Sequence, residues 1–165
     1  MTLRIAKTLL VFAVAVFYSF VVLNNTTDYD SNYQFVRHVL SMDSTFPGNH
    51  SMWRAISNPL WHTAFYLAII AWEFLTAVLL GWGAIRLARM FNGSAQEFRT
   101  AAGVAITGLW VGLLMWLVAF LDVGGNWFLM WQSKTWNGKD VAVQMFTVLG
   151  LVLVLMALPE PEERK

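Results

Sequence analysis

The chain has 165 residues, of which 58% are hydrophobic and only 13% charged, and it carries nine tryptophans, no cysteine and a formal net charge of +1. Soluble domains are about 45–50% apolar and about 25% charged, so the composition predicts an integral membrane protein. The scattered basic residues form no stripe that would suit nucleic acid. The lack of cysteine excludes disulfides, thiolate metal ligands and cysteine nucleophiles.

Four apolar runs predict four transmembrane helices, at about residues 5–23, 60–83, 101–121 and 141–158. About 20 helical residues cross a hydrocarbon core of ~30 Å, and a spanning segment must satisfy its own backbone hydrogen bonds. We therefore expect an all-α fold, a four-transmembrane-helix bundle in a single domain. The first run is long and lacks a small-residue cleavage pattern before its polar end, which favours a retained anchor over a signal peptide.

The distribution of lysine and arginine predicts the orientation. With the N-terminus inside, the inner set is Arg4, Lys7, Arg86, Arg89, Arg99, Arg164 and Lys165, and the outer set is Arg37, Arg54, Lys134 and Lys139. The positive-inside rule then places both termini in the cytoplasm. The two outer loops, residues 24–59 and 122–140, are the elaborate ones.

The first outer loop is long enough to contain structure of its own. Asn32 can cap a short helix, whose predicted apolar face is Phe35, Val36, Val39 and Leu40. A second short helix is expected around residues 52–56. The pair Asn58-Pro59 is typical of a helix cap followed by proline at the first helical position, so it opens the second span.

The second outer loop is rich in tryptophan. Gly124-Gly125 is expected to end the third span, and Trp127 and Trp131 are four residues apart, which predicts a short helix lying flat at the membrane surface. The alternative is that these rings form one wall of a ligand or partner site, with the first outer loop as the other wall. Candidates for this outer cap are Trp53, Trp127, Trp131, Trp136 and Asp122.

Four stretches of the chain resemble a known family: "DYDSNYQFVRHVLSMDSTFPGN", "MWRAI", "AWE" and "WFLMWQSKTWNG". They are similar to the bacterial predicted small integral membrane proteins called domain-of-unknown-function family 2165. The resemblance covers nearly the whole chain. It implies a four-span protein of a bacterial cytoplasmic (inner) membrane and implies no activity.

Glu73 is the one acid inside a predicted span, near its middle. A charge at that depth costs roughly 3 kcal/mol, so Glu73 should face the bundle interior. Thr107 and Trp110 on the third span are candidate partners. Further candidates are Thr147, Tyr18 and Ser19. Two interpretations stay open: a carboxyl that fixes helix packing through a hydrogen bond, and a proton-binding or ligand-binding acid.

His62 precedes Glu73 by eleven residues, about three helical turns, and Tyr66 lies between them on the same face. These three side chains predict a polar track from the outer surface into the membrane, as a proton relay would need. The alternative is that His62 and Tyr66 are ordinary residues of the membrane interface.

Metal and cofactor signals are weak. The pairs His38 with Met42 and His50 with Met52 offer imidazole and thioether groups that suit copper(I). With three histidines and no cysteine, we predict no metal site and no cofactor, while a bound lipid or quinone stays open.

Three functions fit these features. The favoured one is a non-catalytic accessory subunit or ligand-binding module, whose aromatic outer cap covers the intramembrane acid. The alternatives are an oligomeric proton-coupled transporter or channel with Glu73 as the carrier group, and a membrane enzyme acting on a lipid or quinone. Expected partners are membrane lipids and either another protein or further copies of the chain, and no nucleic acid.

Overall fold

The computed structural model describes residues 2–159, and every regular element in this range is a helix. The five α-helices are α1 (Thr2–Thr27), α2 (Tyr29–Ser41), α3 (Pro59–Arg89), α4 (Ala95–Leu114) and α5 (Lys139–Ala157). The shorter elements are the 3₁₀ turns η1 (Met52–Arg54) and η3 (Met130–Gln132) and the π-helical segment η2 (Met115–Trp127). Arg164 and Lys165, which entered the orientation argument, lie outside the described residues.

Four helices in this range are long and apolar enough to cross a membrane, which confirms the predicted four-span fold. They are Thr2–Thr27, Pro59–Arg89, Ala95–Trp127 and Lys139–Ala157, and the first three extend past the apolar runs. Asn58 caps α3 as expected, because its side chain accepts a hydrogen bond from the Leu60 amide at 3.0 Å. Ser94 and Glu97 form a reciprocal capping box at the start of α4.

The expectation that Gly124-Gly125 ends the third span is wrong. The helix continues through both glycines as η2, and the Phe128 amide still bonds the Val123 carbonyl, five residues earlier, at 2.9 Å. The wider π turn brings backbone carbonyls close to the glycines: a Cβ on Gly125 would lie 3.2 Å from the Phe120 carbonyl oxygen. π-Helical segments are rare and are frequently found at functional sites.

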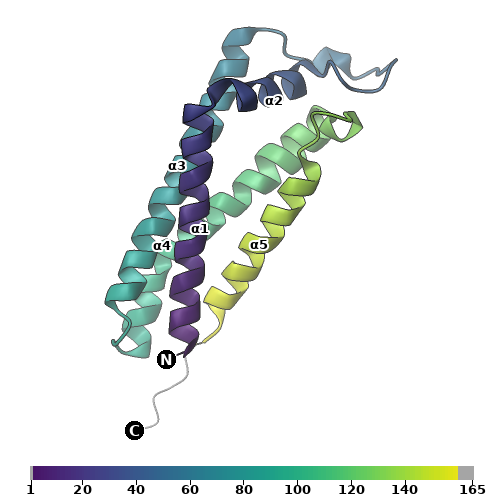
Figure 1. Cartoon of the computed structure of the whole chain (residues 1–165). Helices are drawn as coiled ribbons and strands as arrows, with labels where there is room; N and C mark the ends of the chain where they lie inside the picture. The colour runs from purple at the N-terminus through teal and green to yellow at the C-terminus, as the bar shows by residue number, and fades with distance from the viewer. Residues whose placement is uncertain (1, 160–165) are drawn as a thin grey trace.

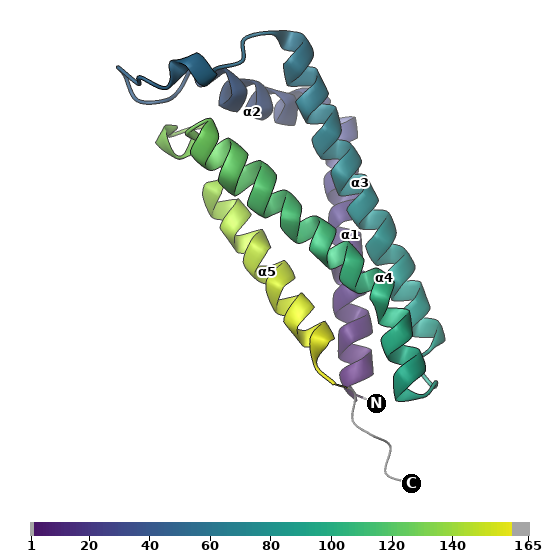
Figure 2. The same ribbon diagram turned by 180° about the vertical axis from the view of Figure 1, so that it is seen from behind.

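The helices form two arms that diverge toward one end of the molecule (Figure 1). At the end that holds Thr2, α1, α3 and α4 lie together. Farther along, α4 and η2 lean away from α3 and are accompanied by α5 (Figure 2). At the end opposite Thr2, α2 lies across the top of α1 and over the space between the two arms.

The predicted short helix of the first outer loop is confirmed as α2, which begins at Tyr29 rather than Asn32. Its predicted apolar face turns inward, with Val36, Val39 and Leu40 buried. The second expected helix is only the 3₁₀ turn η1.

Small residues let α3 and α4 approach closely toward the end of the molecule that holds Thr2. A Cβ on Gly83 would lie 2.7 Å from the Cα, Cβ and N atoms of Ala105. Membrane helices associate through close van der Waals packing at small residues, because the hydrophobic effect does not drive their association in lipid. The contact of Gly83 with Ala105 is of this kind. It fixes the closed end of the molecule, from which the two arms diverge.

Candidate functional site

The carboxyl of Glu73 is buried where α1, α2 and α3 meet. Glu73 is 3% exposed, and its Oε2 accepts a hydrogen bond from the Asn25 side-chain amide at 2.6 Å. The Tyr66 hydroxyl donates to the Asn25 backbone carbonyl at 3.1 Å. Asn25 therefore joins the two α3 side chains that the sequence predicts on one face. We call Glu73, Asn25 and Tyr66 the acid site.

The acid site lies near the middle of α3 but close to the end of α1. Asn25 is two residues from the end of α1, whereas α3 extends fourteen residues from Glu73 to its own start at Pro59. At 1.5 Å per residue, those fourteen residues extend α3 by about 21 Å beyond the acid. Along this stretch α2 takes over from α1 as the neighbour of α3 and covers the acid site.

Asn25 is the site residue that the sequence reasoning missed. The polar run that follows the first apolar segment was interpreted as a loop, but α1 remains helical through Thr27. A signal was present: Asn25 follows Tyr18 by seven residues, as Tyr18 follows Val11, and all three are buried. Seven residues are about two helical turns, so these side chains share one face of α1.

Thr107 and Trp110 were predicted as partners of Glu73, and this is wrong. Both face outward: Thr107 is exposed and donates to the Gly103 carbonyl of its own helix at 3.0 Å, and Trp110 is 50% exposed. The opposite face of α4 packs on α3 through its alanines and glycines. Thr147 and Ser19 are also exposed and bond their own helices.

Tyr18 is the one further candidate partner that lies inside the bundle. It is fully buried, and its hydroxyl accepts a hydrogen bond from the Trp116 indole at 2.9 Å. This bond ties α1 to η2, about two helical turns along α1 from Asn25. Trp116 in turn contributes to the walls of the cavity beside Glu73.

His62 is buried on the predicted face of α3 with Tyr66 and Glu73, but it does not extend the acid site. Its Nε2 lies 2.7 Å from the Ile56 carbonyl oxygen, so it fastens the end of the first outer loop to the start of α3. Among the described residues no hydrogen bond joins His62 to Tyr66. Hydrogen bonds therefore link Tyr66 to Glu73 through Asn25, and His62 is not part of this linkage.

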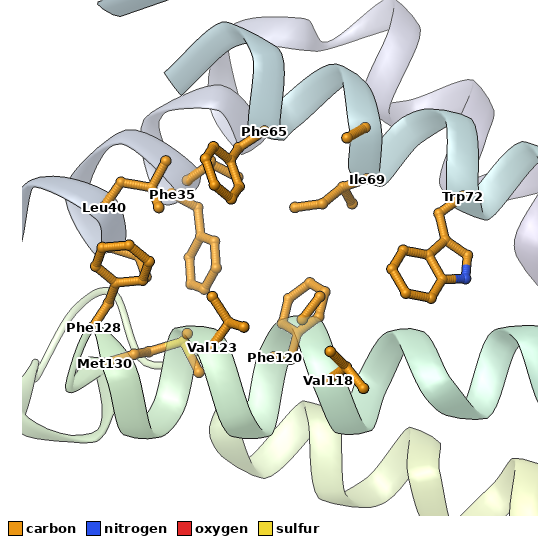
Figure 3. Close-up of a pocket in the computed structure, with 15 residues that line it drawn as sticks. Phe35, Leu40, Phe65, Ile69, Trp72, Val118, Phe120, Val123, Phe128 and Met130 are labelled. Carbon is orange, nitrogen blue, oxygen red and sulfur yellow. The ribbon is translucent and has the colours of Figure 1, made fainter. Parts of the chain in front are cut away.

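An apolar cleft of about 250 Å³ separates the two arms beneath α2. Figure 3 shows its walls: Phe35, Leu40, Phe65, Ile69 and Trp72 from α2 and α3 face Val118, Phe120, Val123, Phe128 and Met130 from η2 and the segment after it. No charged side chain lines this cleft.

A second cavity of about 230 Å³, the acid cavity, adjoins the cleft. Its polar lining is Glu73, Asn25, Asn32 and Tyr66. The two spaces share four lining residues, Phe35, Val36, Ile69 and Phe120. The rings of Phe35 and Phe120 stack with centroids 6.5 Å apart, so two aromatic side chains form the partition between an apolar space and one that contains a carboxyl.

The tryptophans of the outer loops lie around the rim of this region. Trp53 and Trp127 meet edge to face at 5.8 Å, and the Arg54 guanidinium lies over both rings. Trp131 contacts Phe46 in the same way, and Trp136 stacks on His38 with centroids 4.5 Å apart. These contacts between aromatic rings join the two outer loops. Asp122 is exposed on η2 and makes no hydrogen bond with the described residues.

The expected flat helix containing Trp127 and Trp131 is wrong. Leu129 adopts a left-handed conformation with φ 55° and separates Trp127, the last residue of η2, from Trp131 in the 3₁₀ turn η3. The cover over the acid site is α2, with Tyr29 and Tyr33 packed edge to face on Tyr66. The tryptophan side chains lie around the rim of this cover.

The weak copper candidates are not brought together. His38 pairs through Nδ1 with the Asp43 carboxylate at 2.7 Å, and Met42 is buried in the apolar cluster under α2. His50 and Met52 are exposed. Within residues 2–159 no group of three or more histidine, aspartate or glutamate side chains is placed to hold a metal ion.

Comparison with known proteins identifies the family. Residues 3–159 match the family described as predicted small integral membrane protein, DUF2165. The chain belongs to the DUF2165 family. No curated protein and no solved structure is detectably similar to it. The family description names no activity, and the acid site and the cleft are the features that bear on function.

Replacing Asn25 in this DUF2165 protein by alanine is expected to lower the free energy of unfolding by about 2 kcal/mol, because a buried carboxyl then loses its hydrogen-bond donor. The measurement is denaturant unfolding in mixed micelles, followed by tryptophan fluorescence. Asn24→Ala is the matched control, since Asn24 is exposed one residue earlier on the same helix. Equal losses for the two variants would contradict the acid site as a stabilising contact.

Proposed function

We propose that the protein is a non-catalytic ligand-binding module of the bacterial cytoplasmic membrane, which takes an apolar chain into the cleft beneath α2. The observation that supports this is the cleft itself: about 250 Å³ between two helical arms, with fifteen lining residues and no charge among them. Ligand pockets are mostly apolar with few polar groups, and here the polar groups are in the adjoining acid cavity.

Packing energetics favour an occupant. Protein interiors are packed as densely as organic crystals, and side chains that face an empty space lose their dispersion contacts. Phe65 and Val118, on opposite walls, are each more than a third exposed, so the cleft opens toward the surrounding membrane. An alkyl or isoprenoid chain of a lipid or quinone can enter from the side and restore those contacts.

Photolabelling tests this proposal. The protein is labelled in its native membrane with a diazirine-bearing alkyl probe, and the labelled residues are mapped by mass spectrometry. We expect labelling to be concentrated at Phe65, Ile69 and Val118. An excess of the same alkyl compound without the diazirine should suppress it. Leu151 and Val154, each 61% exposed on α5, are the matched outward-facing positions and should label without competition. Uniform, non-competable labelling at both sets would refute the proposal.

The accessory role is supported by the outer face. Trp53 is 72% exposed although Arg54 and Trp127 hold it in place. Ordered, exposed tryptophan with arginine is typical of interface anchors. A protein partner or a second copy of the chain is the proposed occupant of this face. Mild extraction from the native membrane should recover it bound, and Trp53→Ala should release it, whereas an unchanged monomer in both preparations would oppose the accessory role.

The proposed orientation puts both termini in the cytoplasm. Arg4 and Lys7 lie at the same end as the α3–α4 turn, since Arg4 donates to the Phe91 and Gly93 carbonyls at 3.0 and 2.6 Å, and Lys7 to the Leu158 carbonyl at 2.6 Å. The positive-inside rule supports a cytoplasmic position for this basic end. Because the chain has no cysteine, a single cysteine at Ser94 should be labelled only from the cytoplasmic side, and labelling from outside would reverse the orientation.

A further inference from the structure

One oxygen of the Glu73 carboxyl has no partner. Oε2 is held by Asn25, whereas Oε1 makes no hydrogen bond with any residue in the range 2–159, and the carboxyl lines the acid cavity. No ion pair to Glu73 occurs within the same range. A carboxyl removed from water and left with a single amide donor is incompletely compensated, so a donor or a positive charge brought into the cavity would be favourable.

The remaining walls of the acid cavity are suited to a cation. Four aromatic side chains from α2, α3 and η2 line it: Phe35, Tyr66, Trp116 and Phe120. The face of an aromatic ring attracts ammonium groups, and cages of several rings recognise quaternary ammonium ligands. A carboxyl oxygen without a partner, in a cavity lined by aromatic side chains, favours a positive, weakly hydrated group over a neutral or an anionic one.

We propose that the acid cavity binds the ammonium head of a lipophilic amine, either protonated or quaternary, whose alkyl chain lies in the apolar cleft. This inference rests on the proposed function, because the alkyl chain of the ligand occupies the same cleft. The arrangement of the two spaces supports a single ligand: they adjoin along Phe35, Val36, Ile69 and Phe120. A ligand with its head beside Glu73 and its tail between Phe65 and Val118 would pass Phe35 and Phe120, whose side chains would have to turn aside.

Size limits the head to a small group. The acid cavity has about 230 Å³, below the range of about 300–1,000 Å³ that is typical of drug-sized ligands. A trimethylammonium group fits this space. A phosphocholine head is larger and also carries a phosphate, which would lie close to the Glu73 carboxyl and be repelled by it. The site therefore takes an ammonium joined directly to the chain.

The test compares decyltrimethylammonium with a neutral isostere, in which a tert-butyl group replaces the ammonium on the same chain. Binding to the full-length protein in maltoside micelles is followed by tryptophan fluorescence, with empty micelles subtracted. We expect the ammonium to bind at least about tenfold more tightly, from ring contact and charge pairing together. Decylphosphocholine should bind no more tightly than the isostere. Equal affinity of all three ligands would overturn the proposal.

Glu73→Gln supplies the second arm. Glutamine keeps the size of the side chain and can still accept a hydrogen bond from Asn25, but it carries no charge. The ammonium preference should fall to within about twofold of the isostere, while isostere affinity stays unchanged and shows that the variant is folded. Asp122→Asn, which removes one exposed negative charge on η2, should leave the preference intact. An unchanged preference in Glu73→Gln would overturn the role of the acid.

The outcomes separate the two proposals. If neither the ammonium nor the isostere binds, the cleft is not a ligand site and the proposed function fails with the inference. If both bind with the same affinity, the cleft function stands and only the ammonium assignment fails. The wild-type comparison needs no variant, so the inference remains testable even if Glu73→Gln does not fold.

Discussion

A tryptophan in place of Ala68 is expected to weaken the binding of an alkyl chain to this protein by about a hundredfold. Ala68 lines the apolar cleft from α3, beside Phe65 and Ile69. An indole at this position would fill the space that three or four methylene groups of a ligand occupy. At about 0.8 kcal/mol for each buried methylene, their displacement costs about 3 kcal/mol, which corresponds to roughly two orders of magnitude in affinity.

Ala71→Trp is the matched control for this change. Ala71 is an exposed alanine on the same helix, one turn away, and it lines neither cavity. The measurement is competition between an alkyl photoprobe and unlabelled chain, with thermal unfolding recorded for both variants. We expect competable labelling to be lost in Ala68→Trp and retained in Ala71→Trp. Retained labelling in both would mean that the chain binds elsewhere on the helical surface.

Gly83→Ala is expected to lower the free energy of unfolding by about 3 kcal/mol, at the upper end of the usual cost of overpacking. The added Cβ would lie 2.7 Å from backbone atoms of Ala105, and backbone cannot move aside as a flexible side chain can. The two helices would have to separate. Unfolding in mixed micelles, followed by far-ultraviolet circular dichroism, measures the loss.

Gly81→Ala provides the comparison, because a Cβ at Gly81 meets nothing within 4 Å. It should be neutral or slightly stabilising, since alanine is the better helix former by up to about 1 kcal/mol. If both glycine variants lost the same stability, helix propensity rather than close contact of α3 with α4 would explain the effect.

The four spans could be predicted because a single physical requirement determines them. About 20 apolar residues with satisfied backbones must cross the hydrocarbon core, and this pattern is visible without any tertiary information. Helix ends were harder to predict. Composition alone predicts that the first helix ends before its polar residues and that the third ends at Gly124-Gly125. Packing keeps α1 helical through Thr27, and a π-helical backbone continues through the two glycines.

The acid site could be predicted only in part. The position of Glu73 on the buried face of α3, with Tyr66 seven residues before it on the same face, follows from helical periodicity. Its partner does not, because which face of a neighbouring helix turns inward depends on packing between helices. Thr107 and Trp110 have suitable chemistry, but the small residues of α4 that contact α3 lie on the opposite face. Asn25 lies on the face of α1 that turns toward Glu73, two residues before the helix ends.

The cleft had no signal in the sequence. It arises because α4 and η2 lean away from α3 while α2 folds across the outer end (Figure 1), and neither feature follows from a pattern of apolar residues. The tryptophans drew attention to the correct end of the molecule. Their rings lie at the rim, however, and the walls of the cleft are phenylalanine, aliphatic side chains and a single indole, Trp72.

An experimental structure of the protein extracted with its native lipids tests the central claim most directly. We predict elongated density in the cleft between Ile69 and Phe120, ending in the acid cavity within hydrogen-bond distance of Glu73. A structure in which α2 lies directly on η2, with the side chains closing both spaces and no density between them, would contradict a ligand-binding role.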